Sequence, residues 1–396
     1  MNPRVARLCL ALGALWLLLA GCQIAPRETA RPARTKLAAP LVVLPAETYG
    51  HVLIVTAAWD KHGPYHFLVD TGSSLTLVSP ELAQRYRDEN ALPASAPPVR
   101  VRSANGETVT LPTTVITRLK LGDAQFERVP VGVFDCGTLS AHYGIKIDGV
   151  LGFSLFRDTR LTLDYPQSRL ILAPARSALL VPGAVLPTQA GANLPIISVR
   201  LGDREIPVLV DSGSDATLNL DPAGLTLRYR AEPRPVALVG TLTGDQTQTG
   251  TRLEADLQIG PYSVPTPIVY LNDSLSSLGG GLLRHFSVTF DPLWHRVVFH
   301  RESRTPLTVP SLRGTGLGFS KTPAYWRVAG VVPNSPASQA GVRKGELVSR
   351  INGEAVAQWS FQRYERLIAE ADRVTYTFLR GTEESDRELP VFLLVP

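Results

Sequence analysis

Two short stretches of the chain have residue types and spacing that could do acid–base chemistry. In each, three apolar residues are followed by Asp, a small hydroxyl residue, Gly and Ser, and the second Asp comes 141 residues after the first (211 − 70). A carboxylate at the mouth of an apolar strand is costly unless it is hydrogen-bonded or shares a proton. Two such carboxylates therefore suggest a pair that holds one proton. The stretches read Asp70-Thr71-Gly72-Ser73 and Asp211-Ser212-Gly213-Ser214.

The segments around the two stretches form one large internal repeat. In both copies an apolar hairpin leads into the Asp, an apolar-apolar-Gly element follows later, and two strands close the copy. The first copy is longer, with 82 residues from Asp to the later Gly (152 − 70) against 68 (279 − 211), and we expect the extra residues at 80–98. The matching segments are 51–69 and 194–210 for the hairpin, 148–152 and 275–279 for the Gly element, and 161–172 and 288–299 for the closing strands.

Each copy also contains a polar hairpin candidate between these landmarks. In the first copy it covers residues 99–111, around Asn105-Gly106, and Asn-Gly is a strong hairpin signal. In the second copy it covers residues 239–250, around Thr243-Gly244. Such a hairpin could fold over a cleft as a flap, and we expect the first one to close over a substrate.

The two Asp motifs resemble the active-site signatures of aspartic proteases, and the Gly elements resemble the later element that packs beside each catalytic loop. From about residue 49 to residue 300 the chain is most similar to bacterial retropepsin-like proteases, with two pepsin-like halves fused. The resemblance implies a mainly β, two-lobed acid-protease fold with lobes at 46–175 and 176–303, and neither metal nor cofactor. It implies these roles: Asp70 and Asp211 are catalytic, Ser73 and Ser214 bond to the carboxylates, Thr71 and Ser212 brace the loops, Gly72 and Gly213 allow the turns, and Asn105 and Gly106 belong to the flap.

The chemistry implied is hydrolysis of a peptide or protein substrate. Two neighbouring carboxylates cannot both ionise cheaply, so the pair titrates as a unit. The charged member takes a proton from a water that attacks the peptide carbonyl, while the protonated member stabilises the oxyanion. Asp215 follows the second motif and is expected to add negative charge near the pair. Because both halves lie in one chain, activity as a monomer is expected.

Other interpretations are weaker. An isolated Asp-Ser/Thr-Gly is usually a simple turn, but its repetition at equivalent points favours the pair. A different class of function remains open, in which the chain is a non-catalytic adaptor that binds peptides. The sequence has no Gly-x-Ser-x-Gly or His-Glu-x-x-His motif. His62 and His66 are separated by Gly63-Pro64, which argues against a metal site on a helix.

Residues 306–396 closely resemble a PDZ domain, an α+β module. The motifs come in order: a Gly-Leu-Gly-Phe loop, a Ser-Pro-Ala stretch from Ser335 to Gly341, and an Asn352-Gly353 turn. Residues 361–371 have the apolar spacing of a helix, and Phe361 and Tyr364 belong either to a groove or to the core. The resemblance implies that a peptide or C-terminal tail binds at the loop, by adding a strand to the neighbouring sheet. The loop residues are Gly316, Leu317, Gly318 and Phe319.

The N-terminus has the pattern of an export signal. Arg4 and Arg7 precede an apolar run at residues 8–20 that is too short to span a bilayer, and the run ends in Leu-Ala-Gly-Cys22. This ending resembles the bacterial lipoprotein box, which implies a signal peptide at 1–21, lipidation of Cys22 and a tether at 22–45. Because Gln23 follows, the resemblance implies anchoring in the outer membrane, facing the periplasm.

Composition excludes some classes of partner. The net charge is +5, or +3 once Arg4 and Arg7 are removed (38 − 35), which is too weak to indicate nucleic acid. If Cys9 leaves with the signal and Cys22 is lipidated, Cys136 is alone and no intramolecular disulfide can form. A single Cys close to an apolar run is expected to be a buried small hydrophobe.

Overall fold

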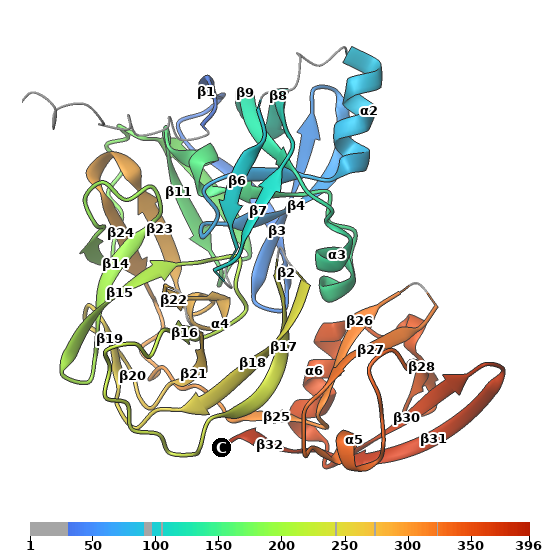
Figure 1. The fold of residues 1–396 in the computed structure, drawn as a ribbon. Helices are drawn as coiled ribbons and strands as arrows, with labels where there is room; N and C mark the ends of the chain where they lie inside the picture. Colours follow the sequence, from blue (N-terminus) through green and yellow to red (C-terminus); the bar gives the residue numbers. More distant parts are fainter. Residues whose placement is uncertain (1–30, 91–96, 104–105, 242–243, 273–274, 323) are drawn as a thin grey trace, which may run out of the picture.

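The computed structural model describes residues 31–90, 97–103, 106–241, 244–272, 275–322 and 324–396. Cys22 and Asn105, which the sequence singles out, lie outside these residues. The described chain is mostly β, with barrel-like sheets and a separate C-terminal unit (Figure 1). Within it, no helix has the length and apolar character needed to cross a membrane. The mainly β fold predicted from the sequence, with an α+β unit after it, is confirmed.

The first lobe, from β1 to β12, is a strongly bent sheet with two helices. The predicted hairpin before Asp70 is β3 and β4, and β4 ends at Asp70 itself. Its core contains two stacked rings, Trp59 and Tyr86, with centroids 3.7 Å apart. Its elements are β1 Arg34–Leu37, β2 Val42–Tyr49, β3 Val52–Trp59, β4 His62–Asp70, β5 Thr76–Val78, α2 Pro80–Asn90, β6 Val99–Arg102, β7 Thr108–Leu111, β8 Thr113–Leu121, β9 Ala124–Val133, α3 Gly137–Tyr143, β10 Gly149–Gly152, β11 Thr159–Asp164 and β12 Arg169–Pro174.

The second lobe, from β13 to β24, repeats the central part of the first. Its hairpin β14–β15 leads into Asp211, and it has no counterpart of α2 among its described residues. Its elements are β13 Ala184–Pro187, β14 Ile196–Leu201, β15 Arg204–Val210, β16 Leu218–Leu220, β17 Arg234–Thr241, β18 Gly244–Arg252, β19 Leu257–Ile259, β20 Tyr262–Val264, β21 Ile268–Leu271, β22 Ser277–Leu278, α4 Gly280–Leu283, β23 Ser287–Asp291 and β24 Arg296–His300.

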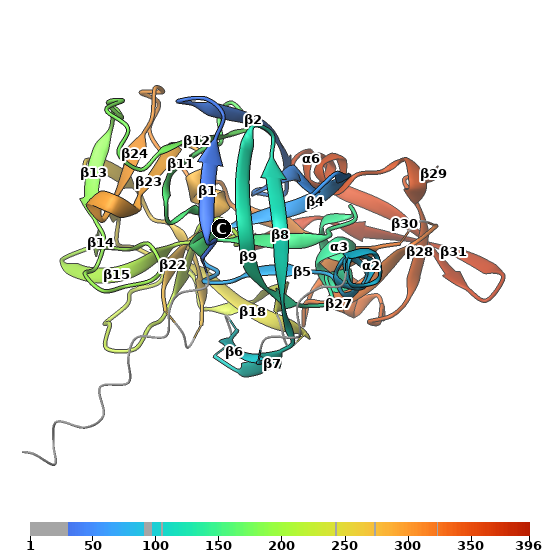
Figure 2. The same cartoon turned by 90° about the horizontal axis from the view of Figure 1, so that it is seen from above.

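One sheet joins the two lobes. Three strands from each lobe lie in the order β2-β12-β11-β23-β24-β13, and the junction is the antiparallel pair β11–β23 (Figure 2). We call this the interlobe sheet. Alternate residues of its strands, such as Leu161, Leu163 and Phe290, are fully buried in the core. The closing strands predicted in both copies are therefore the strands through which the two halves become one body.

The C-terminal unit is a six-stranded sheet with helix α6 packed on it. Ser360 caps α6 by accepting a hydrogen bond from the Arg363 N–H (3.1 Å), so the helix begins where the apolar spacing predicts. A small separate pair, β25–β32, brings the chain end back to the start of the unit. The elements are β25 Leu312–Gly314, β26 Leu317–Lys321, β27 Trp326–Val331, α5 Pro336–Gln339, β28 Leu347–Ile351, β29 Glu354–Ala355, α6 Phe361–Glu370, β30 Arg373–Arg380, β31 Glu383–Pro390 and β32 Phe392–Val395.

The predicted tether at 22–45 is wrong for its second half. Residues 34–37 form β1, which pairs with β9, and β2 begins at Val42. Leu37 packs against the core and Lys36 binds Glu127 (2.6 Å), so this segment is held at both its apolar and its charged positions. The described chain is thus part of the first lobe from residue 34 onward.

Candidate active site

Each Asp motif is positioned by two parallel strands that end at the same level. In the first lobe β4 pairs with β10, so that Asp70 lies opposite Gly152. In the second lobe β15 pairs with β22, and Asp211 N–H donates to the Leu278 carbonyl (2.9 Å). The later Gly elements therefore lie beside the Asp loops.

Four hydrogen bonds tie the two loops to each other. Thr71 N–H donates to Ser212 Oγ and Ser212 N–H donates to Thr71 Oγ1, both at 3.0 Å. The Thr71 hydroxyl donates to the Val210 carbonyl (2.7 Å), and the Ser212 hydroxyl donates to the Val69 carbonyl (2.8 Å). Both side chains are fully buried. The loops are thus braced through the two residues for which the sequence predicts that role.

Each carboxylate lies against the glycine of the opposite loop. A Cβ added to Gly213 would lie 2.5 Å from Asp70 Cγ, and one added to Gly72 would lie 2.5 Å from Asp211 Oδ1. Asp70 Oδ1 accepts hydrogen bonds from the N–H groups of Gly72 (2.8 Å) and Ser73 (3.1 Å), and Asp211 Oδ1 accepts one from Gly213 (3.0 Å). The structure therefore brings Asp70 and Asp211 together, and the glycines permit the approach because they have no side chain.

The environment favours one proton on the pair. Burial raises the pKa of Asp70, and the N–H groups of Gly72 and Ser73 offset part of that rise. Burial and the neighbouring charge of Asp70 raise the pKa of Asp211 well above its ordinary value, against a single N–H from Gly213. Asp70, which accepts more hydrogen bonds, is thus the better holder of the negative charge, and the pair can present one acid and one base at the same time.

The hydroxyls of Ser73 and Ser214 make other contacts than the resemblance implies. The Ser73 hydroxyl donates to the Leu75 carbonyl (2.8 Å), so its proton is not available to a carboxylate. Ser214 Oγ accepts from Ala216 N–H and from the Asn219 amide (3.1 Å). Both residues shape the turn after the Asp, and Ser73 reaches the carboxylate through its backbone. The prediction of side-chain bonds to the carboxylates is wrong for Ser73.

Comparison with family models identifies the domain that carries the first of these loops. Residues 55–155 match the model of an aspartyl protease. They form an aspartyl protease domain. Residues 327–380 match the model of a PDZ domain. No curated protein matches the chain.

Asp215 makes a contact between the lobes of the protease region. Its Oδ1 accepts a hydrogen bond from His51 N–H (2.6 Å), and its Oδ2 lies 3.7 Å from His142 Nε2. Burial alone would raise the pKa of Asp215, but the hydrogen bond and charge of His142, together with His51, hold it below the usual range. The lobes touch closely here, because a Cβ on Gly280 would lie 1.9 Å from the His51 carbonyl oxygen. Asp215 thus stays ionised, and its carboxylate contacts His51 and His142 of the first lobe.

The predicted flap is a two-stranded hairpin, β6–β7, in the protease domain. Gly106 has φ of +84°, which suits glycine at a turn. Val99, Val101 and Val109 pack against an apolar cluster that includes Leu75, directly after the Asp70 loop. The hairpin therefore packs on the same apolar cluster as the residue that follows the Asp70 loop. The corresponding hairpin of the second lobe, β17–β18, lies against α3 of the first.

Helix α3, which the sequence does not predict, links the protease domain to the PDZ domain. It carries His142 and ends at Gly144 in the left-handed conformation (φ +69°). A Cβ on Gly144 would lie 2.9 Å from Lys321 Cδ and 3.4 Å from the Phe361 ring, so α3 meets the ends of β26 and α6 (Figure 1). Strand β26 is the edge of its sheet, and Gly316 (φ +90°) precedes it. The Gly-Leu-Gly-Phe segment runs from this turn into the edge strand.

Two smaller expectations concern cysteine and histidine. Cys136 is 2% exposed, and burial raises its pKa to about 12, so the thiol is the predicted small hydrophobe. Among the described residues, no group of three or more His, Cys, Asp or Glu side chains could hold a metal ion.

Proposed function

We propose that the chain is an aspartic endopeptidase with a fused pair of lobes, in which Asp70 and Asp211 act as the catalytic dyad. The ionised member accepts a proton from a water, and that water attacks the peptide carbonyl. The protonated member donates a hydrogen bond to the developing oxyanion, and its proton moves to the leaving nitrogen as the C–N bond breaks. The other member keeps the proton taken from the water, so the pair again holds one proton. The hydrolysis needs no covalent bond between the enzyme and its substrate.

The observation that carries this proposal is the exchange of hydrogen bonds between Thr71 and Ser212. These fully buried side chains hold two loops from different lobes at one fixed separation. A fixed separation keeps two buried carboxylates close enough to share a proton, which neither would do alone. A pair of unrelated turns would have no need of such bracing.

The PDZ domain is proposed to hold a peptide or a C-terminal tail at the Gly316–Phe319 loop and the β26 edge. Its position beside α3 places any bound peptide next to the protease domain. We also propose that the mature chain is anchored in the bacterial envelope by a lipid on Cys22. Metabolic labelling with a palmitate analogue tests this, because the label should be lost in Cys22→Ser.

Cleavage of an unstructured protein tests the proposed activity. Wild type, Asp70→Asn and Asp211→Asn are compared across about pH 4 to 7.5, with Asp203→Asn in an exposed turn as the matched control. We expect both dyad variants to lose cleavage and the control to retain it. Equal cleavage by wild type and dyad variants would refute the proposal and favour the peptide-binding adaptor. The rate per molecule should not change on dilution, because one chain supplies both carboxylates.

A further inference from the structure

The outer face of the interlobe sheet carries a continuous row of uncharged side chains. Strand register places one residue from each strand in this row, and the Thr162 and Thr289 hydroxyls in its middle are hydrogen-bonded (2.8 Å). The alternate residues of the same strands face the core. The two ends of the row, Val43 and Val185, are 49% and 53% exposed, whereas Thr289 and Val298 between them are each 2% exposed. The row consists of Val43, Ile171, Thr162, Thr289, Val298 and Val185.

The apolar surface is widest at the β13–β24 end of this face. A hollow of about 320 Å³ opens there between the sheet, the segment 177–181 and the turn before β24. Leu180 is 97% exposed and Trp294 is 64% exposed, although both are large apolar side chains. Four of the ten large apolar side chains exposed in the described part of the chain line this hollow: Leu179, Leu180, Val185 and Trp294. The exposed Leu293 directly precedes Trp294. Clustering of this kind marks an interaction surface rather than scattered surface residues.

Buried charges fix the segment that carries Leu179 and Leu180. Arg160 donates to the carbonyls of Leu179 (2.7 Å) and Ser177 (2.9 Å), and it lies 3.5 Å from Asp291. Because Arg160 is 5% exposed, the segment is anchored to the sheet from below. The backbone that carries the two leucines is therefore held in place by hydrogen bonds to a buried side chain.

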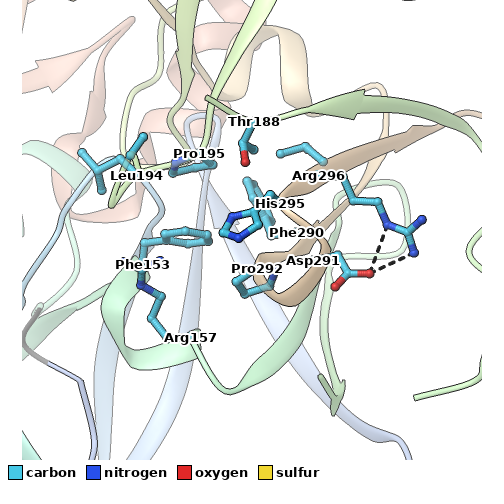
Figure 3. Close-up of a pocket in the computed structure, with 12 residues that line it drawn as sticks. Phe153, Arg157, Thr188, Leu194, Pro195, Phe290, Asp291, Pro292, His295 and Arg296 are labelled. Atoms are coloured by element: carbon cyan, nitrogen blue, oxygen red, sulfur yellow. Dashed lines mark hydrogen bonds and ion pairs between the residues drawn. The ribbon is translucent and has the colours of Figure 1, made fainter. Parts of the chain in front are cut away.

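The described chain begins near the start of β11. Arg31 binds Asp158 (3.8 Å), and the residue before Asp158, Arg157, lines a small pocket together with Pro292 and His295. Figure 3 shows these residues around the pocket, with Phe153 and His295 facing each other. Trp294 lies between Pro292 and His295 in sequence, in the turn that forms one side of this pocket. Arg31 is thus linked, through Asp158 and this pocket, to the turn that carries the 64% exposed Trp294.

We propose that this surface lies on the headgroup region of a lipid bilayer. We call it the Trp294 face: Val43, Val185, Leu179, Leu180, Leu293 and Trp294. Tryptophan and leucine are favoured at such interfaces, and the exposed Arg176, next to Ser177 of the hollow, adds attraction to anionic lipid. Arg31 is nine positions after Cys22 (31 − 22), a distance of at most about 30 Å when the chain is extended. A lipid on Cys22 would therefore hold this end of the molecule at the membrane. A second copy is a poorer occupant, since a two-fold contact would oppose the arginines of both chains. The proposal is independent of proteolytic activity.

Fluorescence of Trp294 tests this orientation directly. Of the five tryptophans, Trp59, Trp326 and Trp359 are buried and Trp16 is in the leader, so a Trp16→Phe background leaves Trp294 as the exposed reporter. The full chain in that background is reconstituted in vesicles of phosphatidylcholine and phosphatidylglycerol with brominated acyl chains. We expect bromine to quench emission at least twice as strongly as in the same chain with Trp294→Phe. Equal quenching would overturn the proposal.

A binding measurement separates the membrane from other occupants. In a Cys22→Ser background, Leu180→Asp should weaken vesicle binding at least tenfold, whereas Leu275→Asp, which is 42% exposed away from this face, should not. Both positions are exposed enough for the variants to fold. Equal effects of the two substitutions would contradict the proposal. So would protection of Trp294 from acrylamide in lipid-free protein, because a second copy or the chain's own N-terminal segment would then already cover the face.

Discussion

The substitution Thr71→Val should lower the free energy of unfolding by weakening the contact between the two lobes, with little change in side-chain shape. Valine replaces the hydroxyl by a methyl group, so the packing volume is kept. The substitution leaves two buried groups unpaired, the Ser212 N–H and the Val210 carbonyl. Each buried group that loses its partner costs about 1–3 kcal/mol, so the expected loss of unfolding free energy for the two groups is roughly 2–6 kcal/mol. For a unit of 150–250 residues, 1 kcal/mol corresponds to about 2–4 °C, which gives a fall of roughly 4–24 °C in the unfolding temperature.

Thermal and urea unfolding measure this loss, with Thr162→Val as the matched control. Thr162 makes its side-chain bond to Thr289 in the interlobe sheet, and it is only partly buried, so a loss near 1 kcal/mol is expected there. Thr71→Val should also lower cleavage, since the carboxylate separation is no longer fixed. A midpoint shift no larger than that of Thr162→Val would refute the idea that the crossed hydrogen bonds hold the loops together.

Three further outcomes follow from the site. Gly213→Ala should lower cleavage about 100-fold or more in a folded protein, because its Cβ would lie 2.5 Å from Asp70 Cγ and displace that carboxylate; wild-type rates with normal circular dichroism would contradict this. Asp211→Asn should be more resistant to urea than wild type at about pH 7. Because the pKa of Asp211 is raised in the folded protein, its protonated form stabilises the fold. This stabilisation is complete below the unfolded pKa of 3.8 and is lost as pH rises through the folded pKa. The difference in urea resistance between Asp211→Asn and wild type should therefore shrink toward about pH 4. Cys136 should react with a thiol reagent only after unfolding, tested at about pH 8 in a Cys9→Ser/Cys22→Ser background, because burial raises its pKa to about 12; reaction in the native state would show that this part of the lobe opens.

Local sequence patterns predict the parts of the fold that depend on neighbouring residues. The hairpins before Asp70 and Asp211, the Gly elements and helix α6 all follow from apolar periodicity and from Gly or Ser at their ends. The internal repeat adds long-range information, since equivalent elements of two copies must adopt the same arrangement. For this reason the amino-acid sequence alone is enough to pair the two Asp loops.

Features that depend on contacts between the copies could not be predicted in this way. The sheet shared by the two lobes requires β11 to pair with β23, more than a hundred residues away. The residues of neither strand indicate which strand it pairs with. Strand β31 has no apolar alternation that would predict it, because its residues are almost all polar, and it forms through pairing with β30. The residues between the flap and β10 gave no helical pattern for α3, a helix of seven residues. Gly280 allows the second lobe to touch the first, a contact that no local pattern indicates.

Helix α3 has a thermodynamic consequence because it belongs to two interfaces. One of its residues reaches Asp215 in the second lobe, and its last turn meets the edge of the PDZ domain. A peptide that moved α3 on binding would have to offset the cost of breaking the lobe contact. Linkage is reciprocal. If the peptide changes the affinity for substrate by some factor, the substrate changes the affinity for the peptide by the same factor. A helix of seven residues would then be enough to make two binding sites communicate.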